Sequence, residues 1–475
     1  MLFNSIHFLV FFPIVVLLYF SLPQKYRWGF LLAASYYFYM QWNWIYIFLI
    51  MSITLIDYFC AIWLEKATKY RKHILAFVLL TNLGLLFTFK YLGFAASSMQ
   101  SLVNILGLPH IFPTINILLP VGISFFTLQA MAYFFDVYKG TRKAERHLGI
   151  FALFIAFFPQ IMAGPIERST NLLPQFFEKH KMNYNDVTAG LRIATWGFFK
   201  KIVVADRAAL IVDYVYASPQ GFSGWALIIA TIAFAFQIYG DFSGYTDIAI
   251  GVGRIMGFRL MKNFNRPYAA KSVADFWRRW HISLSTWFKD YMYIPMGGSR
   301  VNMAKWARNV LVVFIVSGIW HGAEWTFVIW GALLGVWQLL ERFSLPIREW
   351  FWKHWRGNGG RIRAFLAWLV TFGFISFTWI FFRANNRWDA MHIVRNLRID
   401  LDWARLVSTI EMLGWESLAI LTASIIAMEI GQMLLDRKPI KEWKTGARWT
   451  AYAVLVLWIL VFAEHGSQEF IYFQF

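Results

Sequence analysis

The chain has 475 residues, of which 59% are hydrophobic, 20% are aromatic and only 15% are charged, and its mean hydropathy is +0.50. This composition excludes an ordinary soluble protein and predicts a polytopic membrane protein. The formal net charge of +19 would suggest nucleic-acid binding in a soluble protein, but here the basic residues gather in short segments between apolar runs. That distribution is typical of the cytoplasmic side of a membrane protein, so we expect membrane lipid and no nucleic acid as a partner.

The single cysteine, Cys60, lies in an apolar run, which excludes an internal disulfide and any cysteine-based metal cluster. The first apolar stretch, 5–20, has neither a basic n-region nor a small-residue cleavage site. We therefore expect a retained helix there rather than a signal peptide.

Apolar runs of roughly 17 to 25 residues are long enough to cross a bilayer core as helices. In the first third of the chain they are predicted at 5–20, 28–41, 44–64, 74–94 and 117–137. Basic segments follow the third and the fifth of these runs, whereas the stretch 95–116 contains no Lys or Arg. Because cytoplasmic loops carry an excess of Lys and Arg, this alternation predicts an N-terminus on the outer side.

The middle of the chain, 149–260, is interrupted by "AGPIERSTNLLPQ", by Lys200 and Lys201, and by "YGDFSGYTD". Irregular backbone and charges at membrane depth are tolerated where they are buried in protein or line a cavity. We expect broken or tilted helices around a central funnel here, and the number of crossings stays open. Three further helices are predicted at 364–382, 413–434 and 450–463, and the last of them places the C-terminus outside.

The stretch 275–290 is predicted as one helix. Trp277, His281, Leu284 and Phe288 would then form one apolar stripe, at spacings of four, three and four residues. A histidine on such a face can be a structural residue that donates to a backbone carbonyl, so His281 has both a structural and a functional interpretation.

The polar face of the same stretch contains Arg278, Arg279 and Lys289. A surface that rests on anionic lipid headgroups would have this character, and so would a binding site for a phosphate-rich cytoplasmic substrate. Both interpretations stay open.

His321 lies within or at the end of a strongly apolar segment, beside Ser317, Gly318 and Gly322. Small residues in a membrane helix usually indicate close helix packing. An ionisable group at membrane depth, however, is costly and suggests function. Imidazole, with an unperturbed pKa of about 6.5, is well suited to act as a general base near neutral pH.

The motifs "DFWRRWHISLSTWFKDYMYIPMGG" and "GIWHGAEWTFVIWG" resemble the membrane-bound O-acyltransferase family, in particular its bacterial branch that includes the alginate O-acetyltransferase membrane subunit. The similarity extends through "LPVGISFFTLQAMAYFFDVYKG", "FFPQIMAGPIER" and "YGDFSGYTDIAIGVGRIMGFRLMKNFNRPY", and the final "FIYFQF" matches as well. The resemblance thus covers most of a core at 119–331.

The resemblance implies an all-α membrane domain over 1–475, with a ring of roughly 10–13 membrane helices around a central thinned funnel. It implies acyl transfer, with His321 as the catalytic residue and His281 as its polar partner. Acetyl-CoA is the expected acyl donor, for which Trp277, Arg278, Arg279 and Lys289 are the candidate binding residues. We expect no permanently bound cofactor and no metal.

The C-terminal segment 464–475 is predicted to be an exposed tail, and an aromatic terminus of this kind can be an interfacial anchor. A motif like the final "FIYFQF" also lies at the end of the small partner peptide of the related teichoic-acid D-alanylation system. That similarity implies that Tyr472 is a nucleophile that carries the acyl group. A periplasmic SGNH-type acetyltransferase would then pass the acetyl group to a polysaccharide, and alginate, peptidoglycan and cellulose all remain possible acceptors.

The resemblance places the protein in the bacterial inner membrane, with both termini periplasmic. Two other classes stay open, a transporter and a non-catalytic docking subunit of a polysaccharide export or modification complex. A transporter would more commonly contain internal repeats, and the sequence has none that is visible by eye.

Overall fold

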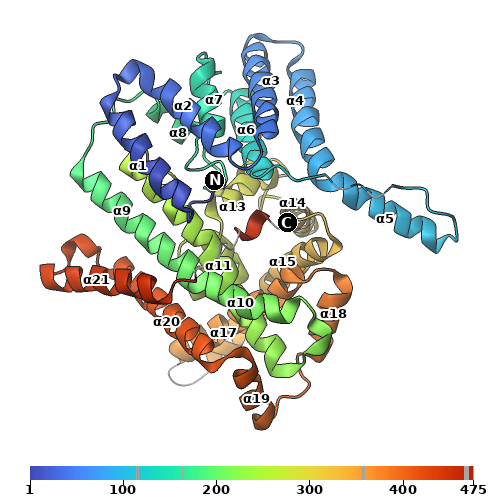
Figure 1. Ribbon diagram of the computed structural model, residues 1–475. Helices are drawn as coiled ribbons and strands as arrows, with labels where there is room; N and C mark the ends of the chain where they lie inside the picture. Colours follow the sequence, from blue (N-terminus) through green and yellow to red (C-terminus); the bar gives the residue numbers. More distant parts are fainter. Residues whose placement is uncertain (114, 116, 163, 355–358, 465–469, 474–475) are drawn as a thin grey trace. The chain divides into compact units, whose positions relative to one another are not determined.

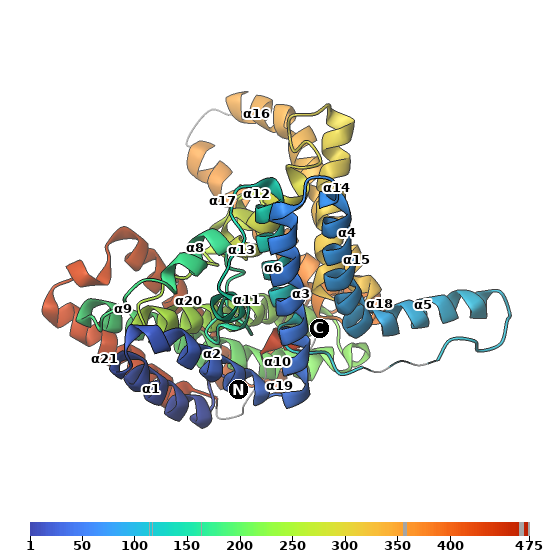
Figure 2. The ribbon, with the colours of Figure 1, turned by 90° about the horizontal axis from the view of Figure 1, so that it is seen from above.

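The computed structural model describes residues 1–475 except 114, 116, 163, 355–358, 465–469 and 474–475 (Figure 1). All regular elements in the described part of the chain are helical, and Figures 1 and 2 show no strand among them. The all-α prediction is therefore confirmed. The chain forms two compact units with interleaved sequences, and each is described here by itself. The single membrane domain over 1–475 stays a prediction.

The first unit comprises Met1–Ala194 and Ile248–Met261. Its helices are α1 (Ile6–Ser21), α2 (Gln24–Met40), η1 (Trp44–Tyr46), α3 (Ile47–Lys66), α4 (Arg71–Leu86), η2 (Phe87–Tyr91), α5 (Leu92–Ile105), α6 (Ile123–Lys139), α7 (Leu148–Ala156), α8 (Ser169–Gln175) and most of α9 (Tyr184–Phe198).

The second unit comprises Thr195–Asp247 and Lys262–Phe475. Its helices are η3 (Phe199–Ala205), α10 (Asp206–Tyr216), η4 (Pro219–Gly221), most of α11 (Gly224–Ile255), η5 (Pro267–Ala269), α12 (Val273–Arg279), α13 (Ile282–Phe288), η6 (Lys289–Tyr293), α14 (Met303–His321), α15 (Trp325–Phe343), α16 (Leu345–His354), α17 (Gly359–Arg383), α18 (Arg387–Asn396), α19 (Trp403–Leu413), α20 (Trp415–Arg437), η7 (Ile440–Glu442), α21 (Thr445–Phe462) and η8 (Ile471–Phe473).

Seven helical segments are long and apolar enough to cross a membrane within the described ranges, or eight if the bent pair α15–α16 counts as one span. They are Trp44–Lys66, Arg71–Ile105, Gly224–Ile255, Met303–His321, Gly360–Arg383, Trp415–Arg437 and Thr445–Phe462. This number is below the 10–13 that we expected. Part of the difference is length, because α1 has 16 residues and α6 has 17, and about 20 apolar residues are needed to span a bilayer core.

Helix α6 forms the core of the first unit and packs against α3 and α4. Its interior residues Tyr133 and Phe134 are fully buried. The helix begins at Ile123 rather than near 117, so the predicted start was wrong. Gly122 precedes the helix with a φ of 78°, a left-handed conformation that glycine adopts without strain and that separates the helix from the extended chain before it.

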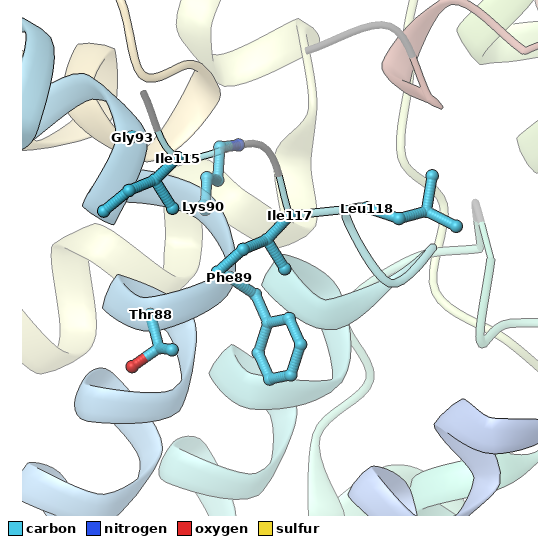
Figure 3. Close-up of a pocket in the computed structure, with 7 residues that line it drawn as sticks. All are labelled: Thr88, Phe89, Lys90, Gly93, Ile115, Ile117 and Leu118. Carbon is cyan, nitrogen blue, oxygen red and sulfur yellow. The ribbon is translucent and has the colours of Figure 1, made fainter. Parts of the chain in front are cut away.

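Helix α4 continues through the π-helical turn η2 into α5, so that residues 92–105 are helical rather than part of an outer loop. A cavity of about 390 Å³ lies beside this turn. Figure 3 shows that Thr88, Phe89, Lys90 and Gly93 line it from the helical segment, and that Ile115, Ile117 and Leu118 line it from the loop that follows. None of the predicted site residues lines this cavity.

We expected "YGDFSGYTD" to interrupt a helix. In the second unit it instead lies within the 32-residue helix α11. Gly244 lets this helix approach the π-helix η3 closely. A Cβ atom at Gly244 would lie 2.7 Å from the carbonyl oxygen of Gly197 and 3.0 Å from the amide nitrogen of Lys201. The charged residues of the motif are accommodated because they pair with lysines of η3.

Helices α14 and α15 pack side by side as a hairpin (Figure 1). A Cβ atom at Gly318 would lie 3.3 Å from the Cα atom of Gly331 and would collide with the backbone of Phe327. The small residues near His321 thus permit close helix packing, as one of the two interpretations of the sequence predicted.

Candidate active site

His281 does not lie within a helix, because the predicted helix 275–290 is broken in two. Helix α12 ends at Arg279, α13 begins at Ile282, and His281 between them has a φ of 43°. A positive φ is rare for a residue with a side chain. Because the helix is broken at this residue, the predicted apolar stripe does not form; its members were Trp277, His281, Leu284 and Phe288. Periodicity gave no sign of this break.

Asn263 stabilises the start of α13. Its backbone carbonyl accepts a hydrogen bond from the Ile282 N–H at 2.9 Å, and its side-chain oxygen accepts from the N–H and the hydroxyl of Ser283 at 3.1 and 2.9 Å. The first N–H groups of a helix have no partner within the helix. Asn263 supplies such a partner and thereby fixes the turn on which His281 lies.

His281 itself is fully buried, and its ring packs edge-on against Phe242 of α11 at 4.6 Å between centroids. Burial lowers the pKa of His281 to about 3. The imidazole is therefore neutral near pH 7.

His321 is the last residue of α14 and is 2% exposed. Aromatic rings surround it, with centroid distances of 4.9 Å to Trp320, 5.1 Å to Trp330 and 5.4 Å to Phe382. The space left by the missing side chain of Gly322 is filled by Phe327, whose ring a Cβ atom there would overlap. His321 thus lies in a largely apolar environment, as the sequence indicated.

The C-terminal segment packs into this aromatic cluster. Phe470 and Ile471 are 0% and 2% exposed, so the prediction of an exposed tail is wrong for these two residues, while 465–469 and 474–475 lie outside the described residues. The Tyr472 ring is partly exposed, but its hydroxyl oxygen is buried. Burial, and secondarily the charge of Asp241, raises the pKa of Tyr472 above its usual range.

The structure brings together all three predicted catalytic residues. The ring centroids of His321 and Tyr472 are 5.8 Å apart, and those of His281 and His321 are 6.5 Å apart. Phe242 contacts both His281 and Tyr472, the latter at 4.5 Å. Two imidazoles and a phenol therefore share one buried cluster, in which a proton could pass from the phenol to an imidazole.

Three buried charged residues, of which Asp241 contacts the C-terminal segment, were not predicted as site residues. Lys201 Nζ lies 2.8 Å from Asp206 Oδ1 and 2.8 Å from Asp241 Oδ1. The other carboxylate oxygen of Asp241 accepts a hydrogen bond from the Ile471 N–H at 2.6 Å. The sequence contained a signal, since Lys201 and "YGDFSGYTD" were both noted as charges in apolar surroundings, but it did not show that they pair.

These charges are almost completely buried, with side-chain exposures of 1% for Lys201, 2% for Asp206 and 3% for Asp241. Burial alone would lower the pKa of Lys201, but the two carboxylates outweigh it and raise that pKa. The ammonium group is thus held charged, and a buried charge of this kind is stable only while its partners remain in place.

A cavity of about 230 Å³ lies against α14 on the side of Ser317, one turn before His321. The predicted donor-binding residues Trp277 and Lys289 line it, together with aromatic and apolar residues that include Phe288, Trp306 and Phe314. The Trp277 ring also contacts Trp330, which contacts His321. The rings of Trp277 and Trp330 thus connect the lining of the cavity to His321.

The other two predicted donor-binding residues do not line this cavity. Arg278 is exposed, and Arg279 Nε forms an ion pair at 3.0 Å with Asp275 on the preceding turn of α12. The structure thus brings two of the four candidates together at one cavity, and the donor-binding role of all four stays a prediction.

The sequence matches the model of the MBOAT, membrane-bound O-acyltransferase family over residues 31–384. Among curated relatives, the probable alginate O-acetylase AlgI of Azotobacter vinelandii is 36% identical over 440 residues, which cover 92% of this chain and 83% of that protein. A peptidoglycan O-acetyltransferase of Helicobacter pylori is 37% identical over 396 residues, or 77% of this chain and 73% of that protein. A teichoic acid D-alanyltransferase of Bacillus subtilis is 29% identical over 286 residues, or 58% of this chain and 71% of that protein.

Proposed function

The chain belongs to the membrane-bound O-acyltransferase family, and on that basis we propose that it moves an acetyl group from cytoplasmic acetyl-CoA to the hydroxyl of Tyr472. The acetyl group is then used to O-acetylate a polysaccharide outside the cytoplasm. The observation that carries this proposal is the contact between His321 and Tyr472, whose ring centroids are 5.8 Å apart in a buried cluster.

The first step needs a base. An unperturbed tyrosine has a pKa near 10, and burial raises the pKa of Tyr472 further, so the phenolate form is scarce at neutral pH. His321 takes the phenolic proton as the oxygen attacks the thioester carbonyl carbon. When the carbon–sulfur bond breaks, the protonated His321 returns the proton to the thiolate, which leaves free CoA and an acetyl ester on Tyr472.

His281 is proposed to assist as a neutral imidazole. Because burial keeps it uncharged, it can donate one N–H to the oxygen on which negative charge develops, or to the donor as it binds. Its fixed position at the turn between α12 and α13 suits such a role, since a preorganised donor costs no rearrangement when the charge forms.

The cavity beside α14 is the proposed location of the donor near its reactive end. Its apolar lining suits the pantetheine arm, and Lys289 at its edge supplies a positive charge for a phosphate group. Arg278, which is exposed in α12, is proposed to contact the phosphates of the nucleotide end.

In the second step a hydroxyl of a periplasmic SGNH-type partner attacks the tyrosyl ester and receives the acetyl group, and Tyr472 is regenerated. The polysaccharide acceptor is proposed to be alginate-like or peptidoglycan, on the basis of the names of the relatives. This relay avoids moving acetyl-CoA itself through the bilayer, whose core penalises even one charge.

We propose that the protein lies in the bacterial inner membrane, as the names and organisms of its relatives suggest. The distribution of Lys and Arg along the sequence supports a periplasmic position of both termini. In this orientation the C-terminal segment approaches His321 from the outer side. The acyl group would thus change compartment without the donor crossing the membrane.

The proposal is tested by mixing the purified full chain, in lipid nanodiscs without a partner, with acetyl-CoA and following the release of free CoA. A burst of about one CoA per chain is expected, because Tyr472 is then fully acetylated and no acceptor regenerates it. His321→Gln should abolish the burst. An unchanged burst in that variant would exclude His321 as the base.

A further inference from the structure

We propose that Asp241 is a positioning residue that holds the C-terminal segment so that Tyr472 stays in contact with His321. The proposal rests on the role of Tyr472 given above, but it makes a separate statement about what binds the tail. The buried group of Lys201, Asp206 and Asp241, here called the clamp, binds the main chain of the C-terminal segment through Asp241.

The two oxygens of Asp241 have different partners. Oδ1 lies 2.8 Å from Lys201 Nζ, and Oδ2 accepts a hydrogen bond of 2.6 Å from the Ile471 N–H. One carboxylate therefore connects an internal ion pair to the residue directly before Tyr472, across 230 positions of sequence.

The hydrogen bond between the Ile471 N–H and Asp241 stabilises the buried charged group as well as the C-terminal segment. Lys201 lies between the carboxyl groups of Asp206 and Asp241, and all three side chains are nearly inaccessible to water. Burial raises the pKa of Asp206 to about 7, so the carboxylate of Asp241 is the main partner of the Lys201 charge near neutral pH. A buried carboxylate is stabilised by hydrogen-bond donors aimed at its oxygens. The Ile471 N–H is such a donor, so the docked tail completes the group that holds it.

Asp241 and its neighbour Phe242 position Tyr472 through two different contacts. Asp241 fixes the backbone at Ile471, whereas the ring of Phe242 contacts the Tyr472 ring at 4.5 Å and the His281 ring at 4.6 Å. The two residues are consecutive on α11, so a shift of the helix would move both contacts together.

Close packing of α11 against η3 keeps Asp241 in place. A Cβ atom at Gly240 would lie 2.9 Å from the carbonyl oxygen of Lys200, and one at Gly244 would lie 3.0 Å from the amide nitrogen of Lys201. These two glycines flank Asp241 and allow Lys201 to reach it. η3 is a π-helix, a form that is rare and frequently found at functional sites.

The proposal is tested on both sides of the Asp241–Ile471 bond. Asp241→Asn removes the charge. Asp247→Asn is its control, because Asp247 lies on the same helix and also pairs with a lysine at 2.6 Å, but accepts no hydrogen bond from the described tail residues 470–473. Ile471→Pro removes the N–H donor and leaves all three charged residues unchanged. Ile471→Val is its control, since it keeps the donor.

Two measurements are made on each full-length variant in nanodiscs. The first is the rate at which carboxypeptidase releases Tyr472, which reports tail docking whether or not Tyr472 carries an acetyl group. The second is the rate constant of the CoA burst as a function of acetyl-CoA concentration, which separates the maximal rate from the half-saturating donor concentration, here called the KM.

We expect Asp241→Asn and Ile471→Pro to speed the release of Tyr472 by at least about tenfold and to slow CoA release by about 100-fold at saturating donor, with KM changed less than about twofold. Both controls should match the wild type. If Ile471→Pro, whose change lies in the terminal segment, releases Tyr472 at the wild-type rate, the clamp does not exist. Should the clamp variants loosen the tail while the wild type shows no burst, the clamp stands and the acyl-carrying role of Tyr472 is wrong.

Discussion

The rings of His321 and Tyr472 are in contact, with centroids 5.8 Å apart, although His321 ends helix α14 and Tyr472 is the fourth residue from the end of the sequence. This relationship places a potential base beside a potential nucleophile in an apolar cluster. The predictions below follow from it and from the groups that hold the two residues in place.

Tyr472→Phe should abolish polysaccharide acetylation in cells while the protein remains folded. The phenyl ring can keep the contacts with Phe242 and Phe470, and only the nucleophilic oxygen is lost. The measurement is the acetyl content of the extracellular or cell-wall polysaccharide. Tyr184→Phe, at a position that is 80% exposed, is the matched control, and a normal acetyl content in the Tyr472→Phe strain would contradict the relay.

His321→Gln should lower the rate of acetyl transfer by about 10²–10⁴-fold, the range that general-base catalysis contributes. Glutamine is close to histidine in size but cannot accept a proton near neutral pH. The rate is measured as CoA release by the purified chain. His392→Gln, in α18 of the same unit, should retain the wild-type rate, and loss of activity in both variants would point to a folding defect instead.

Ser317→Leu should raise the KM for acetyl-CoA by about tenfold, because the larger side chain would occupy the cavity of about 230 Å³ that Ser317 lines. The neighbouring Val316 does not line the cavity, so Val316→Leu should leave the KM unchanged. The measurement is initial rate against acetyl-CoA concentration. An unchanged KM in the Ser317 variant would exclude this cavity as the donor site.

The burial of His281 should make the free energy of unfolding decrease at acidic pH. Its pKa is about 3 in the folded chain and about 6.5 when unfolded, so the unfolded state binds more protons between these values. The stabilisation from its neutral form is complete above about pH 6.5 and is lost as the pH falls toward 3, at a cost of up to a few kcal/mol.

That prediction is checked by thermal unfolding in detergent at pH 7.5 and pH 5. His281→Gln should reduce the drop in Tm between the two values by about 1–2 °C, the shift expected for about 1–2 kcal/mol in a chain of 475 residues. His392→Gln should not reduce it. An equal drop in the wild type and the His281 variant would show that His281 does not control acid sensitivity.

Gly244→Ala should destabilise the second unit by about 1–3 kcal/mol, because the added Cβ would lie 2.7 Å from the carbonyl oxygen of Gly197. Gly373→Ala in α17 is the control, since a Cβ there has nothing within 4 Å. The measurement is again the Tm. If both variants have the wild-type Tm, an added Cβ atom at Gly244 is accommodated, and α11 does not pack against η3 as closely as stated here.

The residues with the strongest chemical signal could be predicted from the sequence. His321 was recognised as an ionisable group in an apolar segment beside small residues, and the structure places it at the end of α14 with close helix packing. Long apolar runs were also located well, since the predicted 413–434 corresponds to α20, Trp415–Arg437. Both signals are local, so a single segment contains all the information needed.

The break at His281 could not be predicted in this way. Its positive φ depends on Asn263, which precedes it by eighteen positions and satisfies the first N–H groups of α13. The ion pair between Lys201 and Asp241 was missed for the same reason. Periodicity describes how one segment presents its faces, but it does not show which distant polar groups will meet once the chain is packed.

The most direct test of acyl transfer to the tail is mass spectrometry of the C-terminal peptide after the purified chain has been incubated with acetyl-CoA. A mass increase of about 42 Da, one acetyl group in place of a hydrogen atom, is expected on Tyr472 and should be absent in the His321→Gln variant. An unmodified C-terminal peptide from a preparation that releases CoA would show that Tyr472 does not carry the acetyl group.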